Sequence, residues 1–285
     1  MTLAGYQVDL VDAGRFALDG GAMFGIVPRA LWSRRIAPDG RNRIPMAAHC
    51  LLLRGHGRVA LVDTGMGDKH LGADGGAKFA DIYAAGPSTL VPGLAALGVA
   101  PADVTDVLLT HLHFDHVGGA VSRGADGALG LTFPEATHHV QRRQWDWAHA
   151  SPREGASFLA ENLDPLGASG RLRLLDGPES PLPETALHLA DGHTRGQQLL
   201  RVGAGRGALL FAGDLLPTAA HVPPLWIMAY DIAPLDTLAE KTALLERAAA
   251  ERWTVVFEHD AATPVGRVDK TDRGFAAVDL RGTLG

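Results

Sequence analysis

The stretch from Thr110 to Gly119 reads THLHFDHVGG and is the most informative segment of the chain. It places three imidazoles and a carboxylate within six residues, directly after the apolar run Val107–Leu109. Because side chains alternate along an extended chain, a strand that ends here would send His111 and His113 to the same side. Imidazole nitrogens and carboxylate oxygens are common ligands of zinc and similar ions. The segment therefore predicts a metal site with ligands for two adjacent ions.

Three later segments repeat this arrangement, because each is an apolar, strand-like run that ends beside a potential ligand. The runs end shortly before His193, Asp214 and His259. Taken singly, these residues have ordinary explanations as a loop histidine, a turn or cap residue and an ion-pair partner. Strand ends at one edge of a sheet, however, can bring distant residues together. We therefore expect these three side chains to join the cluster at 111–116.

These residues together resemble the metallo-β-lactamase-fold hydrolase superfamily. The resemblance rests on landmarks that occur in the family's order, namely Asp63-Thr64-Gly65, His111-x-His113-x-Asp115-His116, Gly192-His193-Thr194-x-Gly196-x-Gln198, Gly213-Asp214 and His259. Three further segments look most like quorum-quenching lactonases of the YtnP-like branch and methyl-parathion-hydrolase-like enzymes: Gly21–Gly25, Ile44–Ala47 and Phe257–Asp260.

The resemblance implies an α/β fold, an αββα four-layer sandwich in which two mixed β-sheets lie face to face with helices outside. We expect a single domain over residues 1–285 that binds two divalent metal ions, zinc first, with manganese, cobalt or iron as alternatives. By the same resemblance, one ion would be held by His111, His113 and His193. The other would be held by Asp115, His116 and His259. Asp214 would bridge the two ions, and Asp63 would support the ligand loop from behind.

The resemblance also implies a metal-dependent hydrolase. A hydroxide shared by the ions would attack a lactone or ester carbonyl, and Asp115 would carry the proton to the leaving alkoxide. N-acyl-homoserine lactones are the expected substrates. Aryl esters, organophosphates and glyoxalase II-type thioesters are the alternatives, and a di-iron redox protein or a non-catalytic metal-binding module remains open.

Two positions separate this chain from better-known branches of the family. One group of β-lactamases has a cysteine at the bridging position, where this chain has Asp214, and the only cysteine here is Cys50. Better-studied lactonases have a tyrosine three residues after the bridging aspartate, where this chain has Pro217. His221 and Tyr230 are the candidates to replace that tyrosine.

An apolar substrate pocket is expected from two segments with large side chains. One lies within residues 1–45, which we expect to contain a loop at the pocket or at a dimer contact, and the other follows Pro223-Pro224. The alternative is that these side chains are ordinary core. The candidate pocket residues, suited to an acyl or aryl group of a small-molecule substrate, are Met23, Phe24, His221, Trp226, Met228 and Tyr230.

Composition disfavours several other classes of protein. The chain has 285 residues, of which 46% are hydrophobic and 20% charged, so it can bury a substantial core. A net charge of -6 argues against nucleic-acid binding, and no apolar run approaches the length of a membrane span. The N-terminal residues lack a signal-peptide pattern, and the single cysteine fits a reducing compartment, so we expect a cytoplasmic protein. Exposed apolar N-terminal segments are consistent with a homodimer.

Hydrophobic periodicity predicts the order of the secondary-structure elements. Strands are expected at 6–11, 47–53, 59–62, 104–110, 137–141, 186–189, 198–202, 208–212 and 254–257. Helices are expected at 88–97, 142–150, 156–163 and 236–249. A polar region rich in glycine and proline extends from 151 to 183.

Overall fold

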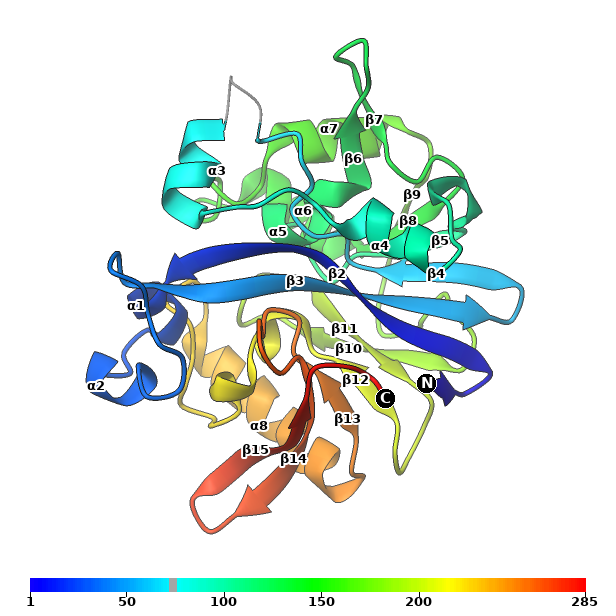
Figure 1. Ribbon diagram of the computed structural model, residues 1–285. Coiled ribbons are helices and arrows are strands. Elements are labelled where there is room, and N and C mark those ends of the chain that lie inside the picture. The colour runs from blue at the N-terminus through cyan, green and yellow to red at the C-terminus, as the bar shows by residue number, and fades with distance from the viewer. Residues whose placement is uncertain (72–75) are drawn as a thin grey trace.

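Two mixed β-sheets form the centre of the computed structural model, which describes residues 1–71 and 76–285 (Figure 1). The first sheet has the strand order β1-β2-β3-β4-β5-β8-β9, with bounds Thr2–Leu3, Tyr6–Asp19, Arg43–Gly55, Arg58–Val62, Asp106–Leu108, Thr137–Gln141 and Leu172–Leu175. The second sheet has the order β10 to β15, with bounds Thr185–Ala190, Gln197–Val202, Leu209–Phe211, Thr254–Val256, Val265–Thr271 and Gly274–Arg281. A separate hairpin joins β6 (Val121–Arg123) to β7 (Leu129–Leu131).

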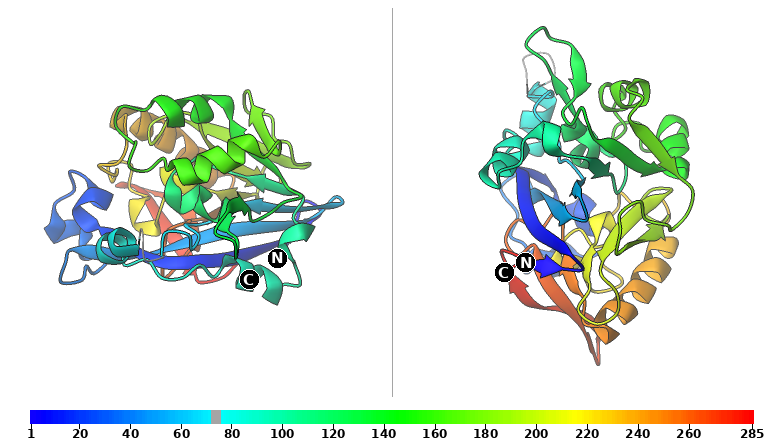
Figure 2. Two further views of the ribbon diagram at one scale, coloured as in Figure 1. Left: turned by 90° about the horizontal axis from the view of Figure 1, so that it is seen from above. Right: turned by 90° about the vertical axis from the view of Figure 1, so that its right-hand side faces the viewer.

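Helices cover the outer faces of both sheets and produce the expected αββα order of four layers. Helices α4 (Leu90–Ala96) and α6 (Arg142–Ala150) pack on the first sheet, and α8 (Pro234–Ala250) packs on the second. Figures 1 and 2 show α8 on the side of the paired sheets opposite to the other long helices. The remaining helices and 3-10 turns are α1 (Gly20–Phe24), α2 (Arg29–Trp32), α3 (Gly76–Tyr83), α5 (Phe114–Val117), α7 (Ala160–Ala168), η1 (Pro101–Asp103), η2 (Gly118–Ala120), η3 (Gly213–Leu215) and η4 (Ala219–His221). No helix in the described ranges combines the length and apolar character needed to cross a membrane.

The space between the two sheets is filled by apolar side chains from both of them. Leu51 and Val62 of the first sheet belong to the same buried cluster as Leu200, Phe211 and Val256 of the second. The parallel pairs β4–β5, β5–β8 and β12–β13 lie inside their sheets. Strands β4, β12 and β13 are largely apolar and do not alternate, as expected for strands covered on both faces, whereas β8 is buried with His138, His139 and Gln141 in it. This packing makes the strand ends a rigid support for the loops that follow them.

The structure differs from the predicted elements at several places, including β2, α7 and the β14–β15 hairpin. Strand β2 is longer than expected, because it continues to Asp19 past a register shift at Asp12/Arg15 and leads into α1 and α2. Helix α7 starts later than expected, because the chain from Glu154 to Ser157 forms a turn whose Ser157 carbonyl accepts from Phe114 N. The β14–β15 hairpin was not expected, since its strands are short of apolar residues and partly exposed.

Candidate metal centre

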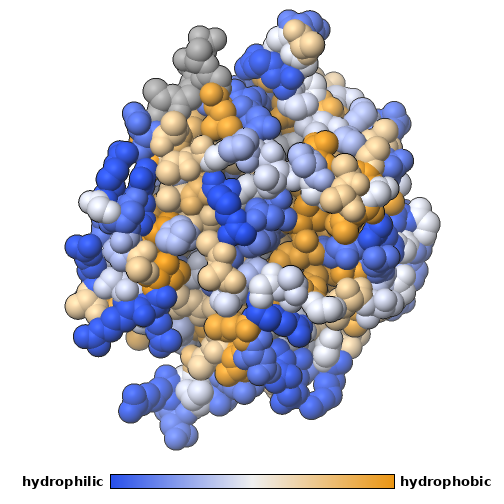
Figure 3. Space-filling model, viewed as in Figure 1, coloured by the Kyte–Doolittle hydropathy of each residue, from blue (hydrophilic) through white to orange (hydrophobic). Residues whose placement is uncertain are grey.

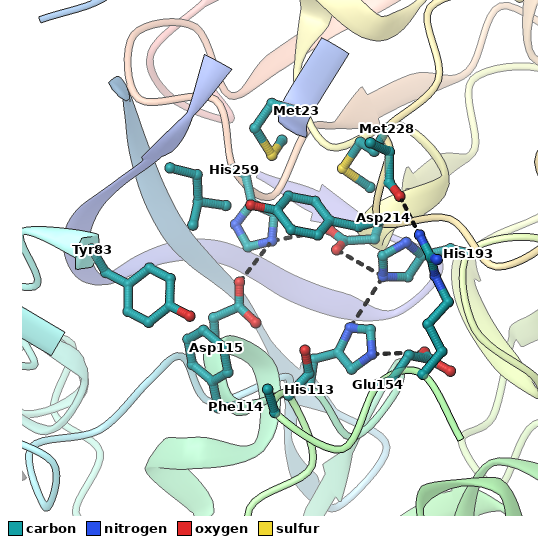
Figure 4. Close-up of a pocket in the computed structure, with 16 residues that line it drawn as sticks. Met23, Tyr83, His113, Phe114, Asp115, Glu154, His193, Asp214, Met228 and His259 are labelled. Carbon is teal, nitrogen blue, oxygen red and sulfur yellow. Dashed lines mark hydrogen bonds and ion pairs between the residues drawn. The ribbon is translucent and has the colours of Figure 1, made fainter. Parts of the chain in front are cut away.

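Loops at the ends of strands from both sheets supply the candidate ligands. In the first sheet, His111 and His113 follow β5, and helix α5 then presents Asp115 and His116. In the second sheet the ends of β10, β12 and β13 lead to the remaining ligand candidates His193, Asp214 and His259. All seven side chains are buried, with at most 8% of any residue exposed. The strand-end pattern in the sequence therefore corresponds to one cluster in space (Figure 4).

The seven residues form two adjacent groups. His111, His113 and His193 lie with Asp214 in one group, while Asp115, His116 and His259 form the other. Asp214 lies between them, since one of its carboxylate oxygens is 3.1 Å from His193 Nε2 and the other is 3.0 Å from His259 Nε2. The structure thus brings together the residues that the resemblance assigns to each ligand set and places Asp214 between the two sets.

Each histidine has one ring nitrogen held by an acceptor outside the cluster. The five contacts are His111 Nδ1 with Thr110 Oγ1 at 3.0 Å, His113 Nε2 with Glu154 at 3.0 Å, His116 Nδ1 with Asp63 at 3.0 Å, His193 Nδ1 with Asp231 at 2.9 Å and His259 Nδ1 with the Ala47 carbonyl at 2.8 Å. A neutral imidazole that donates through this nitrogen keeps a lone pair on the other one. The inward-facing atoms are therefore Nε2 of four rings and Nδ1 of His113.

The inward nitrogens approach one another closely. His113 Nδ1 is 3.0 Å from His111 Nε2 and 3.2 Å from His193 Nε2, and the Nε2 atoms of His116 and His259 are 3.1 Å apart. Lone pairs that face each other at this distance repel unless a proton or a cation lies between them. Nitrogen and carboxylate ligands with outer hydrogen-bond partners are the donor set that divalent metal ions require. The residues present therefore fit two metal ions.

Asp63 supports the ligand loop from behind, which is the position expected for it. Its carboxylate accepts from Thr110 N at 2.7 Å, Thr110 Oγ1 at 2.6 Å and His116 Nδ1 at 3.0 Å. Asp63 has a φ of 55°, a left-handed conformation that aspartate tolerates better than most residues. The glycine pair after the cluster is needed for close packing, since a Cβ on Gly119 would lie 2.1 Å from the Thr64 carbonyl oxygen.

Burial and neighbouring charges shift the pKa values of the cluster in two directions. Asp214 and His111 are favoured in their deprotonated forms, while His193 and His259 are favoured in their protonated forms. Burial would raise the pKa of Asp214, but His259, His116 and His193 hold it well below its usual range. Burial and the neighbouring His116 and His113 lower the pKa of His111 well below its ordinary value. Burial also disfavours charge on His193 and His259, yet Asp214 raises their pKa values to about 10 and about 9. Metal binding would displace those protons, so metal uptake should release protons.

A cavity of about 360 Å³ opens over the ligand groups. Its walls contain the expected residues Met23, Met228 and Tyr230. Figure 4 shows Met23 and Met228 beside His259 and Asp214. Several other lining residues were not expected from the sequence, among them Leu18, Tyr83, Phe114 and Arg153. Glu154 and Asp231, which hold His113 and His193, were also missed, because a carboxylate in an irregular loop carries no distinctive local pattern.

Phe24, Trp226 and His221 lie behind the cavity wall rather than at its surface. The Phe24 ring stacks on His221 at 4.6 Å and meets Trp226 edge-on at 5.6 Å between ring centroids. His221 is 1% exposed, and its ring nitrogens contact Thr218 Oγ1 at 2.7 Å and the Met23 carbonyl at 2.8 Å. The structure therefore gives these three residues a supporting position, and His221 has no ring nitrogen available to a substrate.

The sequence family follows from comparison with known proteins. The family model described as the metallo-beta-lactamase superfamily matches residues 43–259. This chain belongs to the metallo-β-lactamase superfamily. Asp214 lies between the two ligand groups, while Cys50 is buried in β3. Pro217 is also buried, and its carbonyl accepts from His259 N at 2.9 Å, so it supports a ligand loop.

Sequence relatives of this superfamily member include lactonases. The chain is 29% identical to the N-acyl homoserine lactonase AttM of Rhizobium radiobacter over 178 residues, which covers 60% of this chain and 63% of that protein. It is 28% identical to the probable metallo-hydrolase Rv2300c of Mycobacterium tuberculosis over 194 residues, covering 60% of this chain and 57% of that one. The matches thus span less than two thirds of the length of these relatives.

Solved structures show the same fold over nearly the whole chain. A probable metal-dependent hydrolase from Staphylococcus aureus superposes with a TM-score of 0.85 at 27% identity and covers 100% of both chains. AidC, a dizinc quorum-quenching lactonase solved with its product, superposes with a TM-score of 0.77 at 20% identity and covers 98% of this chain and 95% of that one. At 20% identity, the similarity to AidC shows a shared fold and nothing more.

Proposed function

We propose that this chain is a dinuclear metal-dependent lactonase that hydrolyses N-acyl-homoserine lactones. One observation carries the proposal: a largely apolar cavity of about 360 Å³ opens directly over both ligand groups. This volume lies within the usual range for small-molecule sites. The names of the sequence relatives and the product-bound lactonases among the structures of the same fold support the choice of substrate.

The seven candidate ligands would hold two divalent ions, with zinc as the first expectation. His111, His113 and His193 would hold one ion, and Asp214 would contact both. When bound, such ions lower the pKa of water and polarise a carbonyl, which makes hydrolysis possible near neutral pH. The outer partners of the imidazoles would fix the direction of each donor atom before an ion binds.

Asp115 has the position required of a proton carrier. Its carboxylate lines the cavity, and one oxygen lies 3.8 Å from His259 Nε2 while the other lies 3.9 Å from His116 Nε2. We propose that an Asp115 oxygen takes a proton from the attacking water and returns it to the leaving alkoxide. In a lactone this transfer occurs within one molecule, because ring opening leaves the alkoxide attached to the acid.

The apolar wall would receive the acyl chain. Met23 and Met228 line the cavity beside Leu18 and Phe114, and flexible thioether side chains adapt to chains of different length. Helix α1 places Met23 there, since Ala229 N donates to the Ala22 carbonyl at 2.8 Å and fixes the α1 segment against the Met228 segment. The cavity therefore has the candidate metal ligands at its floor and an apolar wall, as an acylated substrate requires.

A homodimer remains a prediction for this chain. Ile26 is 95% exposed and Leu31 is 48% exposed beside α1 and α2. On the face in Figure 3, hydrophobic surface occurs in several areas between hydrophilic side chains. The molar mass in solution, measured by light scattering, distinguishes monomer from dimer.

The proposed function is tested with a substrate panel on protein of known metal content. The panel contains an N-acyl-homoserine lactone, an aryl ester, a thioester and a phosphotriester. We expect the lactone to have the highest kcat/KM by at least about tenfold. A higher kcat/KM for the aryl ester or the phosphotriester would replace the lactonase proposal by one of the alternatives.

A further inference from the structure

Arg153 is a cation at the edge of the metal-site cavity. Among the residues that line this cavity in the described ranges, it is the only lysine or arginine. It lies on the irregular segment between α6 and α7, next to Glu154, whose carboxylate contacts His113 Nε2 at 3.0 Å. Arg153 thus directly precedes Glu154, the residue that holds the candidate ligand His113 in place.

Arg153 makes no ion pair with the residues that the structure describes. The neighbouring Glu154 carboxylate already accepts from His113, Trp147 Nε1 and Ser151 Oγ. The other carboxylates of the cavity, Asp115 and Asp214, belong to the ligand groups. Nearby arginines differ, since Arg142, Arg143 and Arg195 pair with Asp176, Asp191 and Asp236.

One protein contact fixes the position of the guanidinium. Nη2 of Arg153 donates to the Ala229 carbonyl at 2.9 Å, and Ala229 N donates to the Ala22 carbonyl at 2.8 Å. Ala229 lies between the cavity residues Met228 and Tyr230. A guanidinium has five N–H donors in a planar fork, so this contact leaves donors for a bound molecule. Arg153 is therefore held at the wall and remains available.

We infer that Arg153 is a specificity-determining residue that donates to the amide oxygen of the substrate, so that the cavity selects esters and lactones with an acylamino group beside the scissile carbonyl. The inference rests on the proposed function. An acylamino group places an amide oxygen between the reacting carbonyl and an alkyl chain. The cavity has the same order of features, with ligand groups at its floor, Arg153 at its side and Met23 and Met228 in its apolar wall.

Two matched pairs of substrates test this inference. The lactone pair is N-hexanoyl-homoserine lactone and an α-alkyl-γ-butyrolactone of the same chain length without the amide. The ester pair is a p-nitrophenyl N-acylglycinate and a p-nitrophenyl alkanoate of the same length. For each pair, the selectivity is the ratio of kcat/KM with the amide to kcat/KM without it, measured for wild type, Arg153→Met and Arg153→Lys.

We expect Arg153→Met to lower the selectivity by about 10- to 100-fold, the range for loss of a hydrogen bond to a charged donor. The kcat/KM of the substrates without the amide should change by less than about threefold. Arg153→Lys should restore part of the selectivity, since it keeps the charge but not the planar fork. A purely structural role at Ala229 would lower kcat/KM equally for both members of a pair and lower the melting temperature.

An unchanged selectivity in Arg153→Met, or an equal loss for both members, overturns the inference. The two pairs separate this outcome from failure of the proposed function. If wild type hydrolyses the esters but not the lactones, the lactonase proposal fails while the ester pair still tests Arg153. If wild type hydrolyses neither pair at full metal content, both proposals are wrong.

Discussion

The Glu154 carboxylate lies 3.0 Å from His113 Nε2 and thereby turns Nδ1 of the same ring toward His111 and His193. His113 is the one ring of the five that faces the centre through Nδ1. A ring that is bound through Nδ1 can rotate away from the centre unless its other nitrogen is held. Glu154 is 6% exposed and accepts from two further donors, so its own position is well defined.

Glu154→Gln should therefore weaken metal binding by about 10- to 100-fold, the usual cost of losing an outer partner of a ligating histidine. The glutamine side chain is neutral, and its NH2 group would face one of the donors that the Glu154 carboxylate now accepts from. Metal affinity is measured by competition with a chromophoric chelator. Ser151→Ala is the matched control, because it removes a hydrogen bond from the same carboxylate without touching His113. Equal affinities of Glu154→Gln and wild type would contradict the positioning role.

Asp214→Ala should remove hydrolysis and metal together. The carboxylate contacts both ligand groups, so its loss leaves two sets of histidines without the oxygen they share. We expect activity to fall by at least about 100-fold and metal content to fall by at least one ion per chain. Elemental analysis and lactone hydrolysis on the same sample measure both. Asp176→Ala, which removes an exposed carboxylate paired with Arg142, should change neither. Full activity of a folded, metal-depleted Asp214→Ala protein would show that the centre is misassigned.

Tyr230 and His221 are expected to behave differently in the reaction. Tyr230 lines the cavity, and burial with Tyr83 and Asp115 nearby raises its pKa, so its hydroxyl stays protonated at neutral pH. Tyr230→Phe should lower kcat by about 2- to 10-fold, as for loss of a neutral hydrogen bond. His221→Gln should lower the melting temperature but leave kcat/KM of the folded protein within about twofold. A large loss of kcat/KM in folded His221→Gln, with kcat unchanged in Tyr230→Phe, would show that His221 and not Tyr230 acts on the substrate.

Much of the candidate metal centre was predictable, because its candidate ligands lie where strands end. The apolar runs before His111 and Asp214 are visible without a structure, since β5 and β12 are buried along their whole length. The run before His193 belongs to β10, which is only partly buried and contains His188. The strand 137–141 and the helix 142–150 also have the predicted bounds.

The cavity wall and the outer partners of the ligands were much less predictable. Glu154 and Arg153 lie in an irregular polar segment without periodicity, and only the fold shows that this segment passes beside His113. The size of the side chains was not enough to predict which residues line the cavity. Phe24 and Trp226 have the expected size but turn into the layer behind the wall, where Phe24 stacks on His221. The direction of a side chain depends on helix α1, whose five residues are too few for a periodic pattern.

Lys241 provides a test of the packing behind the site. It is 1% exposed, and its Nζ donates to the Trp226 carbonyl at 2.7 Å. Burial lowers its pKa from 10.5 to about 7, although Asp231 partly opposes this shift. Between these pH values the unfolded chain binds more protons than the folded one, so this group makes stability rise with pH and fall as pH drops toward 7.

The difference in unfolding free energy between wild type and Lys241→Met isolates this effect. It should move in favour of wild type by up to roughly 1.4 kcal/mol per pH unit from pH 7 to pH 9. Chemical denaturation at each pH measures it. Lys270→Met is the control, because Lys270 is exposed and pairs with Glu246, and its difference should stay flat. A flat difference for Lys241→Met as well would mean that burial does not lower the pKa of Lys241.

The central claim is that the cluster of five histidines with Asp115 and Asp214 binds two metal ions that hydrolysis requires. The most direct measurement is a titration of zinc into metal-free protein while hydrolysis of N-hexanoyl-homoserine lactone is followed. The account predicts negligible hydrolysis without metal and a rise that stops at two ions per chain. Full hydrolysis in the metal-free protein, or a rise that is complete at one ion per chain, would contradict it.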